Sequence, residues 1–222
     1  MKKWNKLPEE LRKEEIKPYY DTLKKRWMSR FLKRTFDIIM SFFPLIILSF
    51  FFLIIAIIIK CTSKGPVFYR QVRVTRYNQD FRIFKFRTMV QDADKKGSLV
   101  TTKNDNRITK IGKFLRKTKL DELPQLINVF LGQMTFVGTR PEVRKYVDFY
   151  DDKMKATLLM PAGITSSASI KYRDEASLIE NATDVDKVYK EQILPDKMKY
   201  NLEDIEKFNF FREIGLIFKT VF

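Results

Sequence analysis

The polarity pattern of the chain is dominated by one uninterrupted apolar run, Ile38 to Ile59, which holds 22 residues and no charged side chain. As a helix rising about 1.5 Å per residue, it would be about 33 Å long, which matches the hydrocarbon core of a bilayer. A cleavable signal peptide fits poorly, because the run begins late, is long, and is not followed by a small-residue cleavage site. We therefore predict a membrane-embedded helix within residues 33–60.

Weaker patterns flank this run and predict an α+β fold. Apolar residues recur at helical spacing in residues 1–32, which we predict to be an amphipathic surface segment. Alternating aromatic and basic residues on both sides of the polar turn 77–80 predict a small β-hairpin. Residues 61–204 form the expected helix-rich catalytic domain, with helical patterns near 107–118, 122–131, 142–158 and 185–194. Residues 205–222 predict an amphipathic helix that either lies in the membrane interface or packs on the core.

Composition removes several kinds of chemistry. The chain has no histidine and one cysteine, so Ser-His-Asp and Cys-His catalysis, His-ligated zinc, intramolecular disulfides and cysteine-rich metal clusters are all excluded. Any catalysis must therefore use carboxylates, Arg, Lys, hydroxyl groups or a metal held by oxygen.

Charge is concentrated around the apolar run. The first 90 residues hold 20 Lys and Arg against 7 Asp and Glu, which is +13 of the net +16. Such an excess next to an apolar run indicates attraction to anionic membrane lipids. Nucleic acid is the rival partner for basic-aromatic stretches such as residues 81–89, but a strand beside a phosphate site explains this stretch equally well, and we do not expect nucleic-acid binding.

Both flanks of the run are basic, so the positive-inside rule assigns both ends to the cytoplasm, which a single spanning helix cannot satisfy. A break would allow the helix to enter and return. Pro44 removes a helical N–H, and Ser41 and Ser49 can bond free carbonyl groups. The alternative is a spanning anchor in which Pro44 makes only a mild kink, and charge alone does not decide between the two.

An acidic pair, Asp121 and Glu122, lies at a predicted helix start. The structural interpretation is that Asp121 is an N-cap, with Pro124 in the first turn and Gly132 ending the helix. The neighbouring arginines favour chemistry instead. Two carboxylates can hold Mg²⁺ or act as a nucleophile, while Arg116 and Arg140 can bind a diphosphate, a set suited to phosphoryl transfer.

At these residues the chain resembles the bacterial sugar transferases, the monotopic phosphoglycosyl transferases that begin glycan assembly on polyprenyl phosphate. The matching stretches cover most of residues 33–195 in the family's order: KRTFD (33–37), SKGPVFYRQVRV (63–74), FRIFKFRTM (81–89), ITKIGKFLRKTKLDELPQLINV (108–129), GQMTFVGTRPE (132–142), PAGIT (161–165) and ASIKYRDE (168–175).

The resemblance implies that Asp121 attacks a phosphorus of a UDP-sugar, giving a phosphosugar-enzyme ester and UMP, while Glu122 helps to place Mg²⁺, with both carboxylates near the metal. The polyprenyl phosphate then attacks the ester and yields polyprenyl diphosphate-sugar. Arg116 and Arg140 match the family's phosphate-contacting arginines. Lys85 and Arg87 would extend this positive surface, although plain solvent or membrane charge remains an alternative for them.

The resemblance also implies a re-entrant helix with both ends cytosolic, at the cytoplasmic face of the bacterial inner membrane. Lys33, Arg34 and Asp37 match a motif at the membrane boundary, where we expect lipid head-group contact and helix anchoring. Two departures stand out. Ser49 is followed by Phe50 where the family often has Ser-Pro, so Pro44 or Ser49 marks the break, and Thr139 stands where many members have proline.

Two other functions remain as alternatives: a membrane-anchored glycosyltransferase, which would release UDP, and a non-catalytic basic module. The expected partners are a UDP-sugar donor, a polyprenyl phosphate acceptor and anionic lipids, and a homo-oligomer is an option that the sequence leaves open. No residue pattern identifies the sugar, although we expect residues 164–194 to select it.

Overall fold

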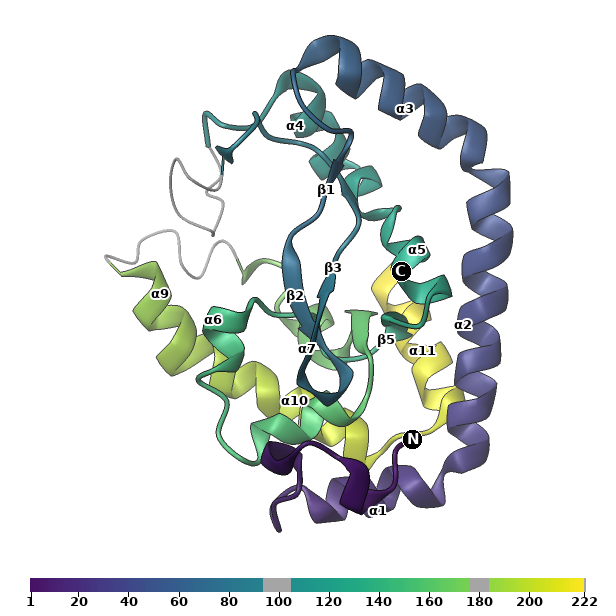
Figure 1. The fold of residues 1–222 in the computed structure, drawn as a ribbon, viewed down its shortest axis with the longest axis vertical. Helices are drawn as coiled ribbons and strands as arrows, with labels where there is room; N and C mark the ends of the chain where they lie inside the picture. The colour runs from purple at the N-terminus through teal and green to yellow at the C-terminus, as the bar shows by residue number, and fades with distance from the viewer. Residues whose placement is uncertain (94–104, 176–183, 222) are drawn as a thin grey trace.

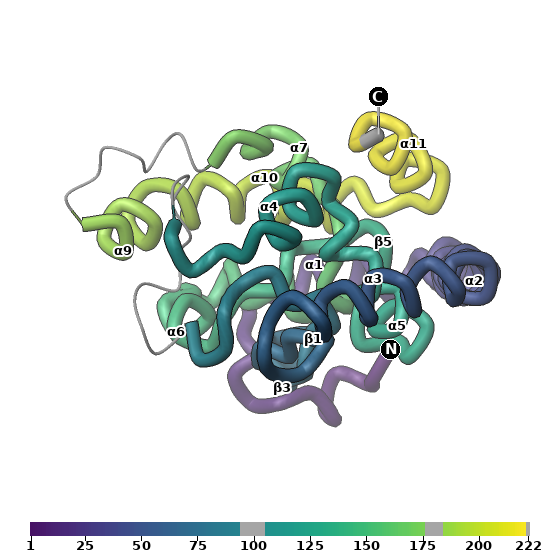
Figure 2. Tube along the Cα trace, turned by 90° about the horizontal axis from the view of Figure 1, so that it is seen from above, coloured from purple at the N-terminus to yellow at the C-terminus, as the bar shows by residue number. Residues whose placement is uncertain are grey.

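Helices make up most of the structure and surround three two-stranded β-ladders (Figure 1). The computed structural model describes residues 1–93, 105–175 and 184–221. This mixture of helices and small sheets agrees with the predicted α+β class. Figure 2 shows α2 and α11 on one side of the molecule and α9 on the opposite side.

The apolar run is divided between two helices, α2 (Trp27–Ile47) and α3 (Ser49–Thr62), which meet at Leu48 with a bend of 62°. The bend lies one turn after Pro44, and Ser49 Oγ donates a hydrogen bond to the Ile46 carbonyl (2.7 Å). Within the described part of the chain, neither helix alone has the length and apolar character of a membrane span, whereas the bent pair has both. This geometry fits a broken span or a re-entrant loop.

The outer faces of α2 and α3 are apolar and exposed to an extent unusual for a folded domain. Ile47 is 76% exposed and Phe50 is 72% exposed, and many of the neighbouring exposed side chains are also aliphatic or aromatic. Figure 1 shows α2 along one edge of the molecule and α3 continuing across its top. Because α2 begins at Trp27, the domain boundary expected between residues 32 and 33 lies inside a helix.

The N-terminal segment is packed into the largest hydrophobic core and is not a separate surface layer. It forms η1 (Trp4–Lys6), η2 (Glu9–Leu11) and α1 (Lys17–Lys25). Leu11, Ile16 and Leu23 are completely buried in a cluster that includes side chains of η6 (Met154–Leu159) and α10 (Leu194–Glu206).

The predicted hairpin is confirmed. Strand β2 (Val72–Thr75) pairs with β3 (Gln79–Arg82) across η3 (Arg76–Asn78), with Val72 opposite Arg82. Farther from the turn, β1 (Phe68–Tyr69) pairs with β4 (Lys85–Phe86). The sequence analysis missed a parallel pair, β5 (Met134–Val137) with β6 (Ala162–Thr165).

The remaining helices are short. They are α4 (Lys110–Lys117), η5 (Leu120–Glu122), α5 (Gln125–Phe130), α6 (Arg144–Val147), α7 (Ser167–Lys171), α9 (Val185–Val188), the π-helical turn η7 (Tyr189–Ile193) and α11 (Phe210–Val221). The predicted helix over 142–158 is replaced by two short helices, α6 and η6, which together cover about half of that range.

The C-terminal helix α11 packs on the domain with one face and exposes aromatic side chains on another, and its place in a membrane interface stays a prediction. One face packs against α2, β5 and β6 and buries Leu216. The other face exposes Phe211 (76%) and Phe218 (61%). The helix begins at Phe210, and α10 continues to Glu206, so the boundary expected at residue 205 also lies inside a helix.

Candidate active site

Helix α4 packs against the segment that directly follows β4, at Thr88. Thr109 caps α4 by accepting from the Gly112 amide (3.0 Å), and the Thr109 amide donates to the Thr88 carbonyl (2.9 Å). A Cβ at Gly112 would lie 2.0 Å from that carbonyl oxygen, so only glycine permits this approach. The contact aligns Arg116, in the last turn of α4, so that its Nε donates to Thr88 Oγ1 (2.9 Å).

A sharp turn then presents the acidic pair. Lys119 adopts a left-handed conformation (φ 58°), which costs a non-glycine residue free energy and reverses the chain before η5. Asp121 is not the N-cap of the following helix, because α5 starts only after Pro124. Gly132, at φ 76°, follows the helix end as predicted.

Glu122 is held by two cations from different parts of the fold. Lys85 Nζ, on β4, lies 2.7 Å from Glu122 Oε1, and an Arg140 guanidinium nitrogen, in the loop after β5, lies 3.3 Å from the same oxygen. Burial would raise the pKa of Glu122, but the charges of Lys85 and Arg140 outweigh it and hold that pKa well below its usual range. Glu122 is therefore ionised throughout the physiological range.

Asp121 has the opposite environment. The residue is 8% exposed, and its buried Oδ1 has no hydrogen-bond partner among the residues that the structure describes. Burial, followed by the adjacent Glu122 charge, raises the pKa of Asp121. A buried carboxylate oxygen without a hydrogen-bond partner destabilises the folded protein unless a ligand or substrate interacts with it. The two neighbouring carboxyl groups thus have pKa values shifted in opposite directions, an arrangement that separates their chemical roles.

Asp121 and Glu122 line a cavity of about 730 Å³ beside the β1–β4 ladder, which we call the dyad cavity. Sequence reasoning placed Lys85, Arg87 and Arg116 near the pair, and all three line this cavity. It missed four further basic residues, Arg70, Arg73, Arg107 and Lys119. Arg70 directly follows β1, which pairs with the strand that carries Lys85, and Arg73 lies on β2. The signal that could have found them is the alternation of basic and aromatic residues in the predicted hairpin.

Arg140 contacts Glu122 from the loop after β5. A buried polar network supports this loop. Arg73 donates to the Pro141 carbonyl (3.0 Å), next to Arg140. Glu142 accepts from the Tyr189 hydroxyl (2.6 Å), and Lys197 Nζ lies 3.8 Å from the same carboxylate oxygen. Because Glu142 is only 7% exposed, these contacts fix the loop from its inner side.

Arg87 lines the cavity, but its guanidinium hydrogen bonds hold the fold together. Its guanidinium donates to the Ser63 carbonyl (2.7 Å), the Ser63 hydroxyl (2.8 Å) and the Pro66 carbonyl. It therefore closes the C-terminal end of α3, where helical carbonyls lack partners. This contact joins the membrane-type helix pair to the strand that carries Lys85.

The three residues expected at the membrane boundary dock α2 onto the domain. Lys33 Nζ donates to the Val137 carbonyl (2.7 Å) and pairs with Glu213 (2.8 Å). The Arg34 guanidinium donates to two carbonyls at the end of α5. Asp37 accepts from Thr135 Oγ1 (2.7 Å). Lys33 and Asp37 are buried against the domain, and their contacts attach α2 to it, while head-group contact stays a prediction.

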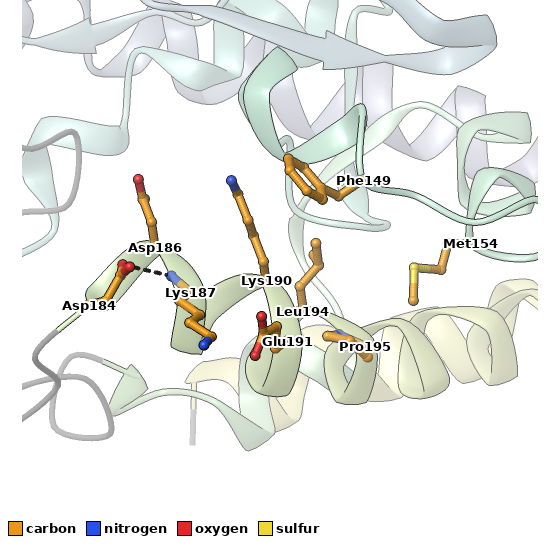
Figure 3. A pocket seen from close by; sticks show the side chains of 9 residues that line it. All are labelled: Phe149, Met154, Asp184, Asp186, Lys187, Lys190, Glu191, Leu194 and Pro195. Carbon is orange, nitrogen blue, oxygen red and sulfur yellow. Dashed lines mark hydrogen bonds between the residues drawn. The ribbon is translucent and has the colours of Figure 1, made fainter.

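A second cavity, of about 640 Å³, lies between η7 and Phe149 (Figure 3). It shares no lining residue with the dyad cavity. Two of its carboxylates are engaged: Asp184 accepts from the Lys187 amide (3.0 Å), and Asp186 accepts from the Tyr146 hydroxyl (2.7 Å). Part of the segment expected to select the sugar, residues 176–183, lies outside the described residues.

The dyad cavity offers few protein ligands for a metal. Within residues 1–93, 105–175 and 184–221, no three His, Cys, Asp or Glu side chains converge on one point. The unpaired Asp121 Oδ1 and the ionised Glu122 are hard oxygen donors of the kind that Mg²⁺ prefers, and this ion commonly takes its other ligands from water and substrate phosphate. The donor set therefore fits a magnesium ion bound together with a diphosphate.

Most of the chain matches a known protein family. The profile of the family described as "Bacterial sugar transferase" matches residues 28–222. The chain belongs to the bacterial sugar transferase family. One relative is a UDP-glucose:undecaprenyl-phosphate glucose-1-phosphate transferase of Klebsiella pneumoniae, 38% identical over 194 residues, which are 86% of this chain and 39% of the relative.

Two further family members illustrate the range of names. A UDP-N-acetylgalactosamine-undecaprenyl-phosphate N-acetylgalactosaminephosphotransferase of Aeromonas hydrophila is 33% identical, over 86% of this chain and 43% of its own length. The exopolysaccharide production protein ExoY of Rhizobium meliloti is 30% identical, over 85% of this chain and 83% of its own length. The chain thus spans about two fifths of the first two relatives and most of the third.

Proposed function

We propose that this chain transfers a sugar 1-phosphate from a UDP-sugar to polyprenyl phosphate, as an early membrane step of polysaccharide or glycoconjugate synthesis. An Asp121 oxygen attacks the phosphorus that carries the sugar, the bond from that phosphorus to the bridging oxygen breaks, and UMP leaves with that oxygen. A phosphate oxygen of the polyprenyl acceptor then attacks the same phosphorus, which releases the Asp121 carboxylate and forms polyprenyl diphosphate-sugar.

The observation that carries this proposal is the contrast within the acidic pair. Glu122 is fixed by Lys85 and Arg140, while Asp121, which lines the same cation-rich cavity, has one buried oxygen with no hydrogen-bond partner among the described residues. A poorly solvated carboxylate is a better nucleophile than one bonded to water or to cations. Arg116, at the rim of the same cavity, can hold the diphosphate oxygens near Asp121.

A magnesium ion, when bound, would neutralise diphosphate charge and so allow an anionic carboxylate to approach phosphorus. Glu122, with Asp121, is the residue that would hold it. Lys85 keeps Glu122 ionised for that role, and Arg140 restrains the same oxygen from the other side.

The membrane part of the proposal is that α2 and α3 enter the cytoplasmic leaflet and return, at the inner membrane of a bacterium. The exposed apolar faces of both helices and the 62° bend support this placement. The contacts of Lys33, Arg34 and Asp37 with the domain would then keep the active site near the head-group plane, where the amphiphilic acceptor presents its phosphate.

The experiment is nucleotide release by detergent-purified protein with Mg²⁺, undecaprenyl phosphate and a panel of UDP-sugars, with UMP and UDP separated chromatographically. We expect UMP with one or a few sugars, no product from Asp121→Asn, and a severe loss of rate and Mg²⁺ response in Glu122→Gln. UDP as the product would indicate a membrane-anchored glycosyltransferase and contradict the proposal, as would wild-type rates in Asp121→Asn.

A further inference from the structure

A separate cavity of about 350 Å³ lies at the base of α2, lined in part by Trp27, Arg30, Phe31 and Arg76 and by the chain near Met160. It shares no lining residue with the dyad cavity. In Figure 1, the base of α2 is at the bottom of the molecule, whereas β1 and α4, which border the dyad cavity, are near the top.

The cavity has an excess of positive charge. Arg30 Nε donates to the Leu23 carbonyl (2.8 Å), and its side chain forms no ion pair with any carboxylate in the described ranges. Arg76 lies beside the Tyr77 ring (5.0 Å) and likewise has no acidic partner among those residues. Arg30 and Arg76 line the same cavity, and burial lowers the pKa of Arg30, with the Arg76 charge as a smaller cause in the same direction.

The other charged side chains at this cavity are already engaged. Lys33 pairs with Glu213, Arg34 donates to the end of α5, and Asp37 accepts from Thr135. Arg30 and Arg76 are therefore the pair that lacks an anion. Two cations held together with no acidic partner predict a negatively charged ligand.

The rim of the cavity is apolar on the side of α2. Trp27 is 59% exposed and Phe31 is 61% exposed, and the exposed apolar face of α2 continues from them toward Ile38 and Phe42. Aromatic side chains next to basic ones are typical of a membrane interface. The ligand suited to this site is thus amphiphilic, with an anionic head for the arginines and apolar chains for the helix face.

We propose that this cavity binds the phosphate group of an anionic phospholipid through Arg30 and Arg76, with the acyl chains along Trp27, Phe31 and the outer face of α2. The site rests on the proposed insertion of α2 and α3 into the leaflet, but it is independent of the transfer chemistry. It would fix the depth and orientation of α2 in an anionic membrane.

The test uses Trp27 as a reporter. Trp4→Phe leaves Trp27 as the single tryptophan, since the chain has two. The full chain in neutral detergent is titrated with phosphatidylglycerol or phosphatidylcholine carrying brominated acyl chains, which quench a neighbouring indole. We expect saturable quenching by the anionic lipid, and an apparent affinity at least about tenfold lower when Arg30→Gln and Arg76→Gln are combined.

Matched variants separate the site from general surface charge. Lys24→Gln with Lys25→Gln removes the same charge from exposed positions on α1 that do not line the cavity, and it should change the affinity less than twofold. Arg30→Lys with Arg76→Lys keeps the charge and should retain most of the binding. Thermal unfolding of each variant identifies a loss of lipid binding that is due to misfolding. The Arg76 side chain donates no hydrogen bond to the backbone within the described chain. Arg76→Gln alone should therefore fold normally and still weaken lipid binding.

Three outcomes would overturn the proposal: equal quenching by both lipids, equal loss in the Lys24/Lys25 variant, or displacement of the lipid by inorganic phosphate with no preference for the amphiphile. The last outcome would assign the cavity to free phosphate. UMP release by the Arg30/Arg76 variant in neutral detergent should equal that of the parent. Failure of the transfer reaction would therefore be visible separately from failure of lipid binding.

Discussion

Lys85 Nζ lies 2.7 Å from Glu122 Oε1, whereas the adjacent Asp121 keeps a buried oxygen with no hydrogen-bond partner in the described structure. Lys85, together with Arg140, thus distinguishes two neighbouring carboxylates. Without these cations, burial would raise the pKa of Glu122 as it raises that of Asp121.

The first prediction concerns this lysine. Lys85→Gln should raise the pKa of Glu122, since the charge that holds it down is removed. A group with a depressed pKa is ionised at all pH values above it, so protonation of Glu122 should not lower wild-type activity down to weakly acidic pH. The variant should lose activity as pH falls from 8 to 6, and its maximal rate should fall by about two orders of magnitude.

The measurement is the pH dependence of UMP release between pH 6 and 9. Lys85→Arg is the control, because it keeps the charge and should keep the wild-type shape of the profile even if its rate is lower. A Lys85→Gln profile parallel to that of the wild type would show that Lys85 does not set the ionisation of Glu122.

The second prediction concerns the close contact between α4 and Thr88. Gly112→Ala should destabilise the protein by about 2 kcal/mol or more, because the new Cβ would lie 2.0 Å from a backbone oxygen that cannot move independently. It should also lower activity, because Arg116 is positioned by the same contact.

Gly215→Ala is the matched control, since a Cβ there meets no atom within 4 Å and the residue lies in α11. It should be neutral or stabilise the protein by up to about 1 kcal/mol. Thermal unfolding in detergent measures both variants. Equal midpoints for the two alanine variants would contradict the role given to Gly112.

The third prediction concerns the network behind Arg140. Burial, followed by the Glu142 charge, raises the pKa of Tyr189, so its hydroxyl stays protonated and donates to Glu142. Tyr189→Phe should therefore cost about 1–3 kcal/mol of stability, because a buried carboxylate loses its donor. It should also weaken UDP-sugar binding, by loosening the loop that carries Arg140.

Tyr200→Phe is the control. Among the described residues, the Tyr200 hydroxyl forms a hydrogen bond only with the exposed Lys171, so this variant should leave both the stability and the KM unchanged. Thermal unfolding and steady-state kinetics measure the two effects. A Tyr189→Phe variant with lowered stability and an unchanged KM would confine the network to a structural role.

The fourth prediction concerns topology. Cys61 is the only cysteine and is exposed, just before the end of α3. In inverted membrane vesicles, a membrane-impermeant thiol reagent should label native Cys61, and it should equally label Asn5→Cys in a Cys61→Ser background. A re-entrant pair leaves both positions on the cytoplasmic side, whereas labelling from opposite sides would establish a broken span.

The sequence predicted local features well where one residue type decides them. The alternation around residues 77–80 predicted the hairpin, and Pro44 and Ser49 flank the observed bend. The parallel β5–β6 pair was missed, because four-residue strands far apart in the chain leave no local period. The helix expected over 142–158 forms only as two short pieces, α6 and η6, because tertiary contacts, such as that of Glu142 with Tyr189, override propensity there.

For the site, the residue pattern and the resemblance pointed to the acidic pair and to different roles for its members, but not to the contacts that make their environments differ. That difference depends on Lys85 and Arg140, which lie 37 and 18 residues from Glu122. Arg87 and the boundary residues Lys33, Arg34 and Asp37 looked like ligand contacts because they are charged. In the structure they bond backbone and side-chain groups that join α2 and α3 to the domain.

The most direct test of the central claim is the intact mass of the purified protein after incubation with Mg²⁺ and its UDP-sugar in the absence of polyprenyl phosphate. We predict an added mass equal to one sugar phosphate, mapped to the peptide that contains Asp121, absent in Asp121→Asn and discharged when polyprenyl phosphate is added. The covalent role of Asp121 would be contradicted if the wild-type protein released UMP in the presence of polyprenyl phosphate but carried no adduct at Asp121 under any quench condition.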